Sequence, residues 1–150
     1  SYKRLVPGYE APCYLAWSAS NRSALVRIPA SRGQSTRVEL RSPDPSCNPY
    51  LAFAACLAAG LDGIERGLTP PPEITENIFA MDRKARKAHG IESLPGSLEE
   101  AIAALEADKL ILDTLGEHVA SNYLEGKKKE WEEYRTRVSS WEREKYIINY

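Results

Sequence analysis

The amino-acid sequence predicts an α+β fold, in which a few short antiparallel strands precede a helical C-terminal region. Two observations support this prediction. Short β-biased runs separated by turn residues fill the first third of the chain, whereas helix-start signals and helical apolar spacing fill the remainder. We therefore expect residues 1–47 to form a strand-and-loop part and residues 48–150 a helical part of one domain.

Three strands are expected, at Pro12–Ser18, Ala24–Ile28 and Arg37–Arg41. The first two are separated by a turn at Asn21, and the last two by Pro29 and Arg32-Gly33. In the third strand the alternation is strict, so that Val38 and Leu40 share one face and the charged residues share the other. We expect the edges of these strands to be exposed, and an exposed strand edge can pair with another chain.

The helical part is expected to begin at Asn48-Pro49, where a capping side chain precedes a proline at the first helical position. The run from Tyr50 to Ile64 is almost wholly apolar. A helix that is apolar on all sides is usually buried. The sequence therefore predicts a helix that is buried on most of its sides.

A proline-rich connection over residues 67–96 follows, with a short helical piece near 77–87. Ser97 and Glu100 then form a capping-box pattern, which predicts the start of another helix. A further helix is expected over residues 117–138, and it is followed by an aromatic tail that suits a binding surface.

Composition and charge exclude several classes of protein. Hydrophobic residues make up 43% and charged residues 27% of the chain, which argues against disorder and collagen-like repeats. The net charge of −1 argues against a nucleic-acid or membrane binder that acts through bulk charge. We expect no signal peptide, and the longest apolar run is too short to cross a bilayer.

Three cysteines without a C-x-x-C pair predict buried, reduced thiols in a reducing compartment such as the cytoplasm.

Basic residues are concentrated in the strand-and-loop part, where seven Lys and Arg stand against three acidic residues, a balance of +4. Arginine suits planar, bidentate recognition of phosphate or carboxylate. In Arg37-x-Glu39-x-Arg41 two cations flank one carboxylate. This pattern fits either a site where an anion and a metal bind together or a solvent-facing ladder of alternating charge, and on the pattern alone the ladder is the more common structure. The arginines in or beside the β-biased segments are Arg4, Arg22, Arg27, Arg37 and Arg41.

Glu10 lies in P-G-Y-E-A-P, where two prolines and a glycine favour a loop held in one conformation. Such a loop is typical of one that carries a catalytic base or closes over a substrate, although a glutamate in a surface turn is the simpler alternative. A divalent metal needs several oxygen ligands, and the first 47 residues contain only three acidic ones. No glycine-rich phosphate loop is present either. A nucleotide–metal site would therefore need residues from elsewhere.

Four segments, taken in order, resemble the C-terminal catalytic region of type I glutamine synthetase. The likeness continues over most of the chain to the tryptophan-containing tail, and the chain opens on a serine, so we expect a fragment of a larger catalytic domain. The four segments are S-Y-K-R-L-V-P-G-Y-E-A-P (Ser1–Pro12), N-R-S-A-L-V-R-I-P (Asn21–Pro29), R-V-E-L-R-S-P-D-P-S-C-N-P-Y-L (Arg37–Leu51) and A-G-L-D-G-I (Ala59–Ile64).

The resemblance implies ATP-dependent ligation of ammonia to L-glutamate through a γ-glutamyl phosphate, with Mg²⁺ or Mn²⁺ as the metal. It also implies a cytoplasmic homo-oligomer, a dodecamer of two stacked hexamers whose active sites lie between subunits, and contact with regulatory proteins. The isolated chain is expected to be inactive, and no nucleic-acid or membrane partner is expected.

The resemblance also implies roles for residues that match the motifs of the family. Arg4 and Arg41 would bind the glutamate substrate. Glu10 would close the glutamate entrance and take a proton from the incoming ammonium. Arg22 would stabilise the transferred phosphoryl group, in contact with both glutamate and ATP.

Arg27 and Arg37 would contact ATP, and Glu39 would bind the metal nearer the ATP phosphates. Some type I enzymes are adenylylated on a tyrosine, but the matching position here is Phe79, which has no hydroxyl. The tail instead resembles the branch that is controlled by glutamine feedback and by regulatory proteins. The resemblance further implies that the C-terminal helix inserts into the opposite ring, which suits the apolar, aromatic residues 147–150.

Two alternatives stay open on the sequence alone. The same fold supports γ-glutamyl ligation of a polyamine or another amine, because amine specificity lies largely in parts of the family upstream of this chain. A non-catalytic module for assembly or regulation is the other alternative, and the incomplete set of metal ligands supports it.

Overall fold

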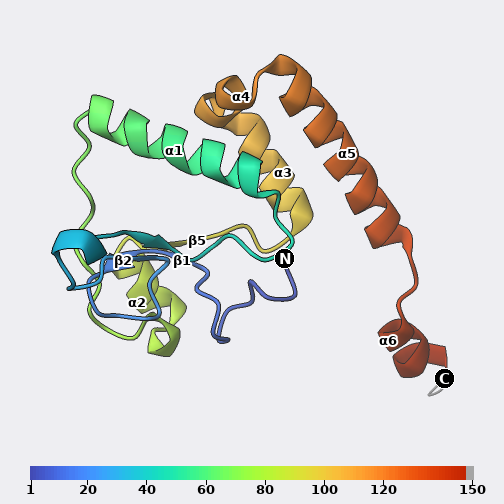
Figure 1. Ribbon diagram of the computed structural model, residues 1–150. Helices are drawn as coiled ribbons and strands as arrows, with labels where there is room; N and C mark the ends of the chain where they lie inside the picture. The colour runs from blue at the N-terminus through green and yellow to red at the C-terminus, as the bar shows by residue number, and fades with distance from the viewer. Residues whose placement is uncertain (148–150) are drawn as a thin grey trace. The chain divides into compact units, whose positions relative to one another are not determined.

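The computed structural model describes residues 1–147, and the chain forms two compact units, Ser1–Ser97 and a second that begins at Leu98. Short strands come first and a helical region follows, which confirms the α+β class (Figure 1). The strands of the first unit are β1 (Tyr14–Leu15), β2 (Trp17–Ser18), β3 (Val26–Arg27), β4 (Glu39–Leu40) and β5 (Glu92–Ser93).

The strands form two small sheets. β1 pairs antiparallel with β5, with Tyr14 opposite Ser93, and β3 pairs antiparallel with β4. β2 and β3 are parallel, with Trp17 opposite Val26, so the prediction of antiparallel strands is wrong for this pair. The predicted strand Pro12–Ser18 is also divided, because its two halves belong to different sheets.

The core of the first unit joins the strand region to residues that lie far along the chain. Ile78 is fully buried at its centre, and Phe79 and Met81 pack against it. The rings of Tyr14 and Phe79 lie 6.3 Å apart between centroids. This core fixes the segment around residue 78 against the strands. Its buried members are Tyr14, Ala16, Ala24, Ile74, Ile78 and Ile91.

The longest helix of the first unit is α1 (Pro49–Glu65), which begins where the sequence predicts it. The Asn48 side chain accepts hydrogen bonds from the backbone N–H groups of Tyr50 (3.0 Å) and Leu51 (3.3 Å), which confirms it as the N-cap. The short helical piece predicted near residues 77–87 is also present. It consists of a 3₁₀ turn (Ile78–Ala80), the helix α2 (Arg83–Ala88) and the two residues between them. A further 3₁₀ turn, Gly33–Ser35, precedes β4.

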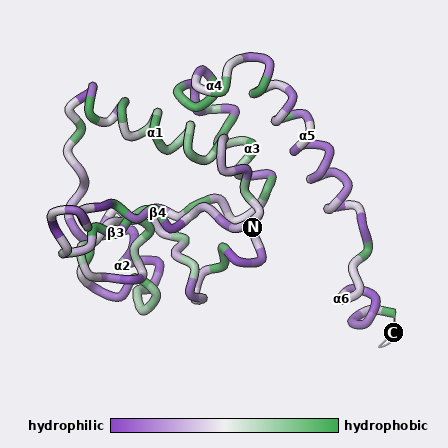
Figure 2. The backbone as a smooth tube through the Cα atoms, in the orientation of Figure 1, coloured by the Kyte–Doolittle hydropathy of each residue, from purple (hydrophilic) through white to green (hydrophobic). Residues whose placement is uncertain are grey.

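The predicted burial of α1 is wrong, because the helix contains no buried residue. Tyr50 is 82% exposed and Ile64 is 78% exposed. Figure 2 shows the helix as a largely hydrophobic stretch of the chain. The composition indicates that α1 needs cover, but the described part of the chain does not bury its large apolar side chains. These side chains are Tyr50, Phe53, Leu57, Leu61 and Ile64.

In residues 98–147 the second unit consists of helices joined by short connections. α3 begins directly after Ser97, as predicted, and the helix predicted over residues 117–138 is α5. α4 was not predicted; the Asp108 side chain caps its start by accepting from the N–H of Ile111 (3.1 Å), and Gly116 with φ +74° follows its end. The elements are α3 (Leu98–Ala107), α4 (Lys109–Leu115), α5 (Glu117–Thr136), α6 (Ser140–Glu142) and a π-helical turn (Arg143–Ile147).

Few residues of this second unit are buried. Ile102 of α3 and Ala120 of α5 are its buried apolar residues among those described. α5 is mostly hydrophilic along its length (Figure 2). The predicted insertion segment 147–150 lies outside the described residues except for its first member.

The sequence also predicts buried cysteines and apolar runs too short to cross a bilayer. All three cysteines are free, but only Cys13 is buried, so the prediction of buried thiols is wrong for Cys47 and Cys56. Both stand in segments whose apolar neighbours are themselves exposed or only partly covered. Across residues 1–147, no helix combines the length and apolar character needed to cross a bilayer.

Candidate active site

The candidate site is a cavity of about 540 Å³ in the first unit. Three of the predicted site residues, Glu10, Arg22 and Arg41, line it together although they are distant in sequence. Its lining therefore combines one carboxylate and two guanidinium groups, which suits a ligand that carries both carboxylate and ammonium groups. The full lining is Glu10, Asn21, Arg22, Ser23, Arg41, Asn77 and Phe79.

Arg22 stands on the loop 19–25, which connects the parallel strands β2 and β3. Its side chain is exposed and makes no hydrogen bond or ion pair with any residue among 1–147. Glu10 is likewise exposed and has no such partner in the same part of the chain. Both side chains are therefore available to a ligand in the cavity.

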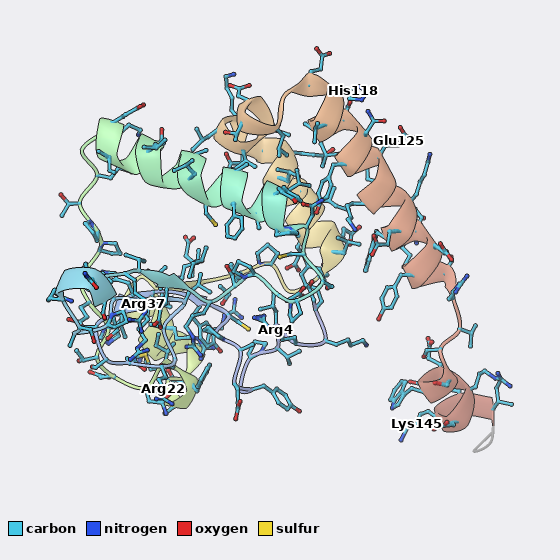
Figure 3. The ribbon with its side chains drawn as sticks, in the orientation of Figure 1. Arg4, Arg22, Arg37, His118, Glu125 and Lys145 are labelled. Carbon is cyan, nitrogen blue, oxygen red and sulfur yellow. The ribbon has the colours of Figure 1, made fainter. Side chains whose placement is uncertain are left out.

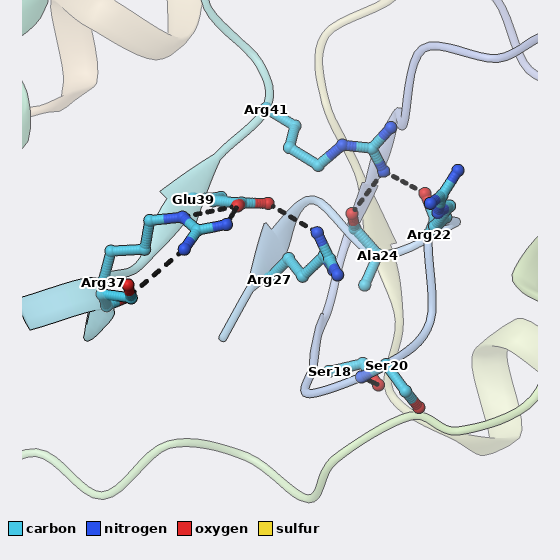
Figure 4. A network of polar contacts seen from close by, with 9 residues as sticks. Ser18, Ser20, Arg22, Ala24, Arg27, Arg37, Glu39 and Arg41 are labelled. Carbon is cyan, nitrogen blue, oxygen red and sulfur yellow. Dashed lines mark hydrogen bonds and ion pairs between the residues drawn. The ribbon is translucent and has the colours of Figure 1, made fainter. Parts of the chain in front are cut away.

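Arg41 is held in place by backbone carbonyls. Its Nη1 donates to the carbonyl oxygen of Arg22 and to that of Ala24 at 3.3 Å (Figure 4). Arg41 follows β4, so these bonds tie the end of that strand to the loop that carries Arg22. The guanidinium of Arg41 is thereby fixed relative to the backbone of Arg22.

A second cluster contains the other predicted residues of the β3–β4 ladder. Arg27 and Glu39 are paired across the ladder, and Arg27 Nη1 donates to Glu39 Oε2 at 3.0 Å. Arg37 Nε donates to the other oxygen, Oε1, at 2.8 Å, as Figure 4 shows. The hydrogen bond from Arg37 is the largest cause that lowers the pKa of the Glu39 carboxyl, with a further contribution from Arg27. Glu39 is therefore held ionised between two cations.

The chemistry of these donors can be tested against the ligands that the sequence predicts. The Nε of Arg27 is buried and has no hydrogen-bond partner among the described residues, so it is a donor that an added anion can satisfy. Between residues 1 and 147 there is no group of three or more His, Cys, Asp or Glu side chains that could hold a metal ion. The described residues thus fit phosphate oxygens but do not form a complete divalent metal site.

Arg4 does not line the cavity. Its guanidinium donates to the carbonyl oxygens of Arg41 (3.1 Å), Pro43 (3.2 Å) and Ser42 (3.4 Å). It therefore anchors the segment that follows β4. Figure 3 shows Arg4, Arg22 and Arg37 on different parts of the first unit.

Several residues of the cavity wall were not predicted as site residues. Asn21 and Ser23 flank Arg22, and Asn77 and Phe79 come from the segment that packs on the core. The N-R-S triplet was a local signal for the first two. The second pair carries no local signal, because its place in the wall depends on contacts made across more than 50 positions of the chain.

Comparison with known proteins gives a consistent result. The sequence profile of the family described as "Glutamine synthetase, catalytic domain" matches residues 1–146. The glutamine synthetase of Thermus thermophilus is 58% identical over 150 residues, which is all of this chain and 34% of that protein. That of Thermotoga maritima is 57% identical over 147 residues, or 98% of this chain and 34% of that protein. The chain thus spans about a third of the length of the curated relatives it matches.

Two solved structures are similar in fold. One, described as a GmaS/ADP complex, has a TM-score of 0.76 and 36% sequence identity, and covers 92% of this chain and 30% of its own. The other, described as apo GmaS without ligand, has a TM-score of 0.75 and the same identity, and covers 97% of this chain and 32% of its own.

Proposed function

Because the chain belongs to the family of the glutamine synthetase catalytic domain, we propose that it is the C-terminal part of a glutamate–ammonia ligase that consumes ATP. The observation that carries this proposal is that Glu10, Arg22 and Arg41 line one cavity together. The similarity to a structure described as an ADP complex supports a nucleotide as the second ligand.

In the proposed reaction, a γ-carboxylate oxygen of glutamate attacks the γ-phosphorus of ATP, and the bond to the leaving ADP breaks. Ammonia then attacks the γ-carbonyl carbon of the γ-glutamyl phosphate, and phosphate leaves. Phosphoryl transfer of this kind depends mainly on positioning and on neutralising charge. A divalent metal, Mg²⁺ or Mn²⁺, would supply part of that neutralisation when bound.

The residues of the cavity take the central roles in this proposal. Arg22, whose guanidinium has no partner within residues 1–147, stabilises the charge on the transferred phosphoryl group. Glu10, exposed at the cavity, accepts the proton that the ammonium ion must lose before its nitrogen can attack. Arg41, which follows β4 and lines the same cavity, binds the glutamate carboxylate.

We propose that the remaining predicted residues have the roles that the family resemblance implies. Arg27 and Arg37 contact ATP, and the unpartnered Nε of Arg27 supports a phosphate contact there. Glu39 is proposed as a metal ligand and Arg4 as a glutamate ligand. In the structure both are occupied, Glu39 by two arginines and Arg4 by three carbonyls, so each would exchange a protein contact for the ligand.

The proposal extends to control and assembly. Phe79 lines the cavity without a hydroxyl, so we propose that adenylylation does not control the enzyme at this position and that glutamine feedback and regulatory proteins do. We also propose a cytoplasmic dodecamer for the complete enzyme. The chain alone is expected to be inactive because its active site is incomplete. Tight, metal-dependent binding in an isothermal titration with ATP and Mg²⁺ would contradict the incomplete nucleotide site.

The test is an assay of the complete enzyme with Arg22→Ala. Removing one preorganised donor to the transition state is expected to cost roughly 3–4 kcal/mol of transition-state stabilisation and so to lower kcat several-hundred-fold. Arg83→Ala, an exposed arginine of α2 outside the cavity, is the matched control. Near-normal turnover of Arg22→Ala would refute the role of Arg22. Faster product formation with a polyamine or another amine than with ammonia would replace the ammonia ligase with an amine ligase.

A further inference from the structure

We propose that Asn21 and Ser23 are positioning residues, which aim Arg22 into the cavity by fastening the loop 18–23 to the segment 73–78. This inference rests on the proposed function in one respect, because it takes Arg22 as the group that acts on the reactants. The fastening itself is a property of the structure. It consists of hydrogen bonds at three points, which involve Asn21, Ser23 and Ser18.

Asn21 bridges the two segments through its side-chain amide. Nδ2 donates to the carbonyl oxygens of Ile74 (3.1 Å) and Glu76 (2.5 Å). Oδ1 accepts from the backbone N–H of Ser23 (2.9 Å) and from its hydroxyl (2.7 Å). Both ends of the amide are thus fully used, and an amide turned by 180° would place donors against donors. The amide therefore favours the pairing of the loop and the segment that the structure shows.

Ser23 makes the second connection, and it does so in the interior. Its side chain is 4% exposed, and its hydroxyl oxygen accepts from the backbone N–H of the fully buried Ile78 at 3.0 Å. A buried N–H without a partner is destabilising, because folding removes its hydrogen bond to water without replacing it. Ser23 therefore satisfies a donor of the core at the same time as it fixes the residue next to Arg22.

The third connection lies at the start of the loop. Glu73 Oε1 accepts from the hydroxyl of Ser18 and from the N–H of Ala19, both at 2.8 Å. The Ser18 oxygen in turn accepts from the N–H of Asn21 at 3.1 Å. With Arg41 also bound to the carbonyl of Arg22, the main chain is held on both sides of Arg22. The side chain of Arg22 stays free while its backbone is fixed.

A fixed backbone with a free side chain serves catalysis if Arg22 contacts the transferred phosphoryl group. A long, flexible side chain reaches a defined point only when its Cα is fixed, and a misplacement of about 1 Å can cost about 100-fold in rate. The segment 73–78 contributes Asn77 to the wall of the same cavity. Asn21 and Ser23 thus set the distance between Arg22 and the opposite wall.

The test uses the complete enzyme with Asn21→Ala, Ser23→Ala and Ser23→Thr, and with Asn122→Ala as control. Asn122 is an exposed asparagine of α5 that donates to the carbonyl of His118, so its removal deletes a comparable bond away from the cavity. We expect Asn21→Ala and Ser23→Ala to lower kcat by about 100-fold with little change in KM for ATP. Ser23→Thr keeps the hydroxyl and is expected to recover most of kcat, and Asn122→Ala to change neither constant.

A double variant separates positioning from a general structural role. If Asn21 acts through Arg22, then Asn21→Ala combined with Arg22→Ala is no slower than Arg22→Ala alone. The proposal would be overturned if the fold-loss of kcat in the double variant equalled the product of the two single losses. A kcat of Asn21→Ala within threefold of wild type would also overturn it.

Hydrogen exchange supplies a readout that does not depend on turnover. Asn21→Ala is expected to speed amide exchange in residues 18–23 and 73–78 and to leave α5 unchanged. Unchanged exchange in both segments would show that Asn21 does not fasten them. If the wild-type enzyme makes no γ-glutamyl product, the proposed function fails, and this measurement still decides the fastening. Should Asn21→Ala not fold, Glu73→Gln weakens the third connection alone and is measured in the same way.

Discussion

Apolar residues are buried in the core beneath the candidate site but are not buried in the helix α1. In the core, residues such as Ile74, Ile78 and Ile91 are buried by contacts that the chain makes with itself. α1 is more apolar in composition than most of the strand region, yet no residue of it is buried. The comparison shows that the part of the chain that forms the cavity is stabilised from within. α1 instead depends on local signals, namely its asparagine cap and its many alanines.

The largest effect is expected from truncating the core. Ile78→Ala removes most of a fully buried side chain and leaves a cavity, so the free energy of unfolding should fall by about 3 kcal/mol. Ile64→Ala makes the same chemical change on exposed α1 and should alter it by less than about 0.5 kcal/mol. Urea denaturation of both variants measures the difference. Equal losses would show that α1 is covered and that the contrast between the two regions is false.

A smaller effect is expected at the cap of α1. Asn48→Ala leaves the N–H groups of Tyr50 and Leu51 without their side-chain acceptor and should destabilise the helix by about 1 kcal/mol. Asn48→Asp keeps an acceptor oxygen and should restore most of this loss. Hydrogen exchange of α1 amides measures the change. Equal protection in all three proteins would mean that packing, and not the cap, holds the helix.

The smallest effect is expected from pH, and it concerns the loop next to the core. Hydrogen bonds from the Ala19 N–H, first, and the Ser18 hydroxyl lower the pKa of the Glu73 carboxyl. A carboxyl with a lowered folded-state pKa stabilises the fold above its unfolded pKa of about 4.3 and loses that contribution as the pH falls through the folded value. Glu73→Gln should therefore be less stable than wild type at pH 7, and the difference should shrink as the pH falls below about 4.

Unfolding midpoints measured at several pH values between 7 and 3 test this expectation. Glu39→Gln should show the same trend, since the hydrogen bond from Arg37 and then that from Arg27 lower the pKa of Glu39. A constant difference between wild type and either variant over this range would contradict the assigned cause.

Local signals predicted much of the fold. Asn48-Pro49 predicted the start of α1, because capping needs only a side chain and the next two N–H groups. β5 was missed, because a two-residue strand has no period and Glu92–Ser93 exists only through its pairing with β1. The predicted burial of α1 is wrong. An apolar composition indicates that a helix needs a covering surface, but it does not show whether the same chain supplies that surface.

The candidate site was predicted in a similarly uneven way. The family motifs indicated Glu10, Arg22 and Arg41, and the structure brings these three into one cavity. The roles of the predicted residues stay predictions. The opposite wall, with Asn77 and Phe79, was not predicted as part of the site, because its position results from tertiary contacts that no local pattern records.

The bonds between the loop 18–23 and the segment 73–78 also have a consequence for chain entropy. Ser23 and Ile78 are 55 positions apart, and bringing them together closes a loop at a cost on the order of 3–4 kcal/mol plus a constant. The bonds of Asn21 and Ser18 close nearly the same loop, so the first bond bears the cost and the others form with little more. The two walls of the cavity therefore order and disorder as one cooperative unit, and a half-formed cavity is the least populated state.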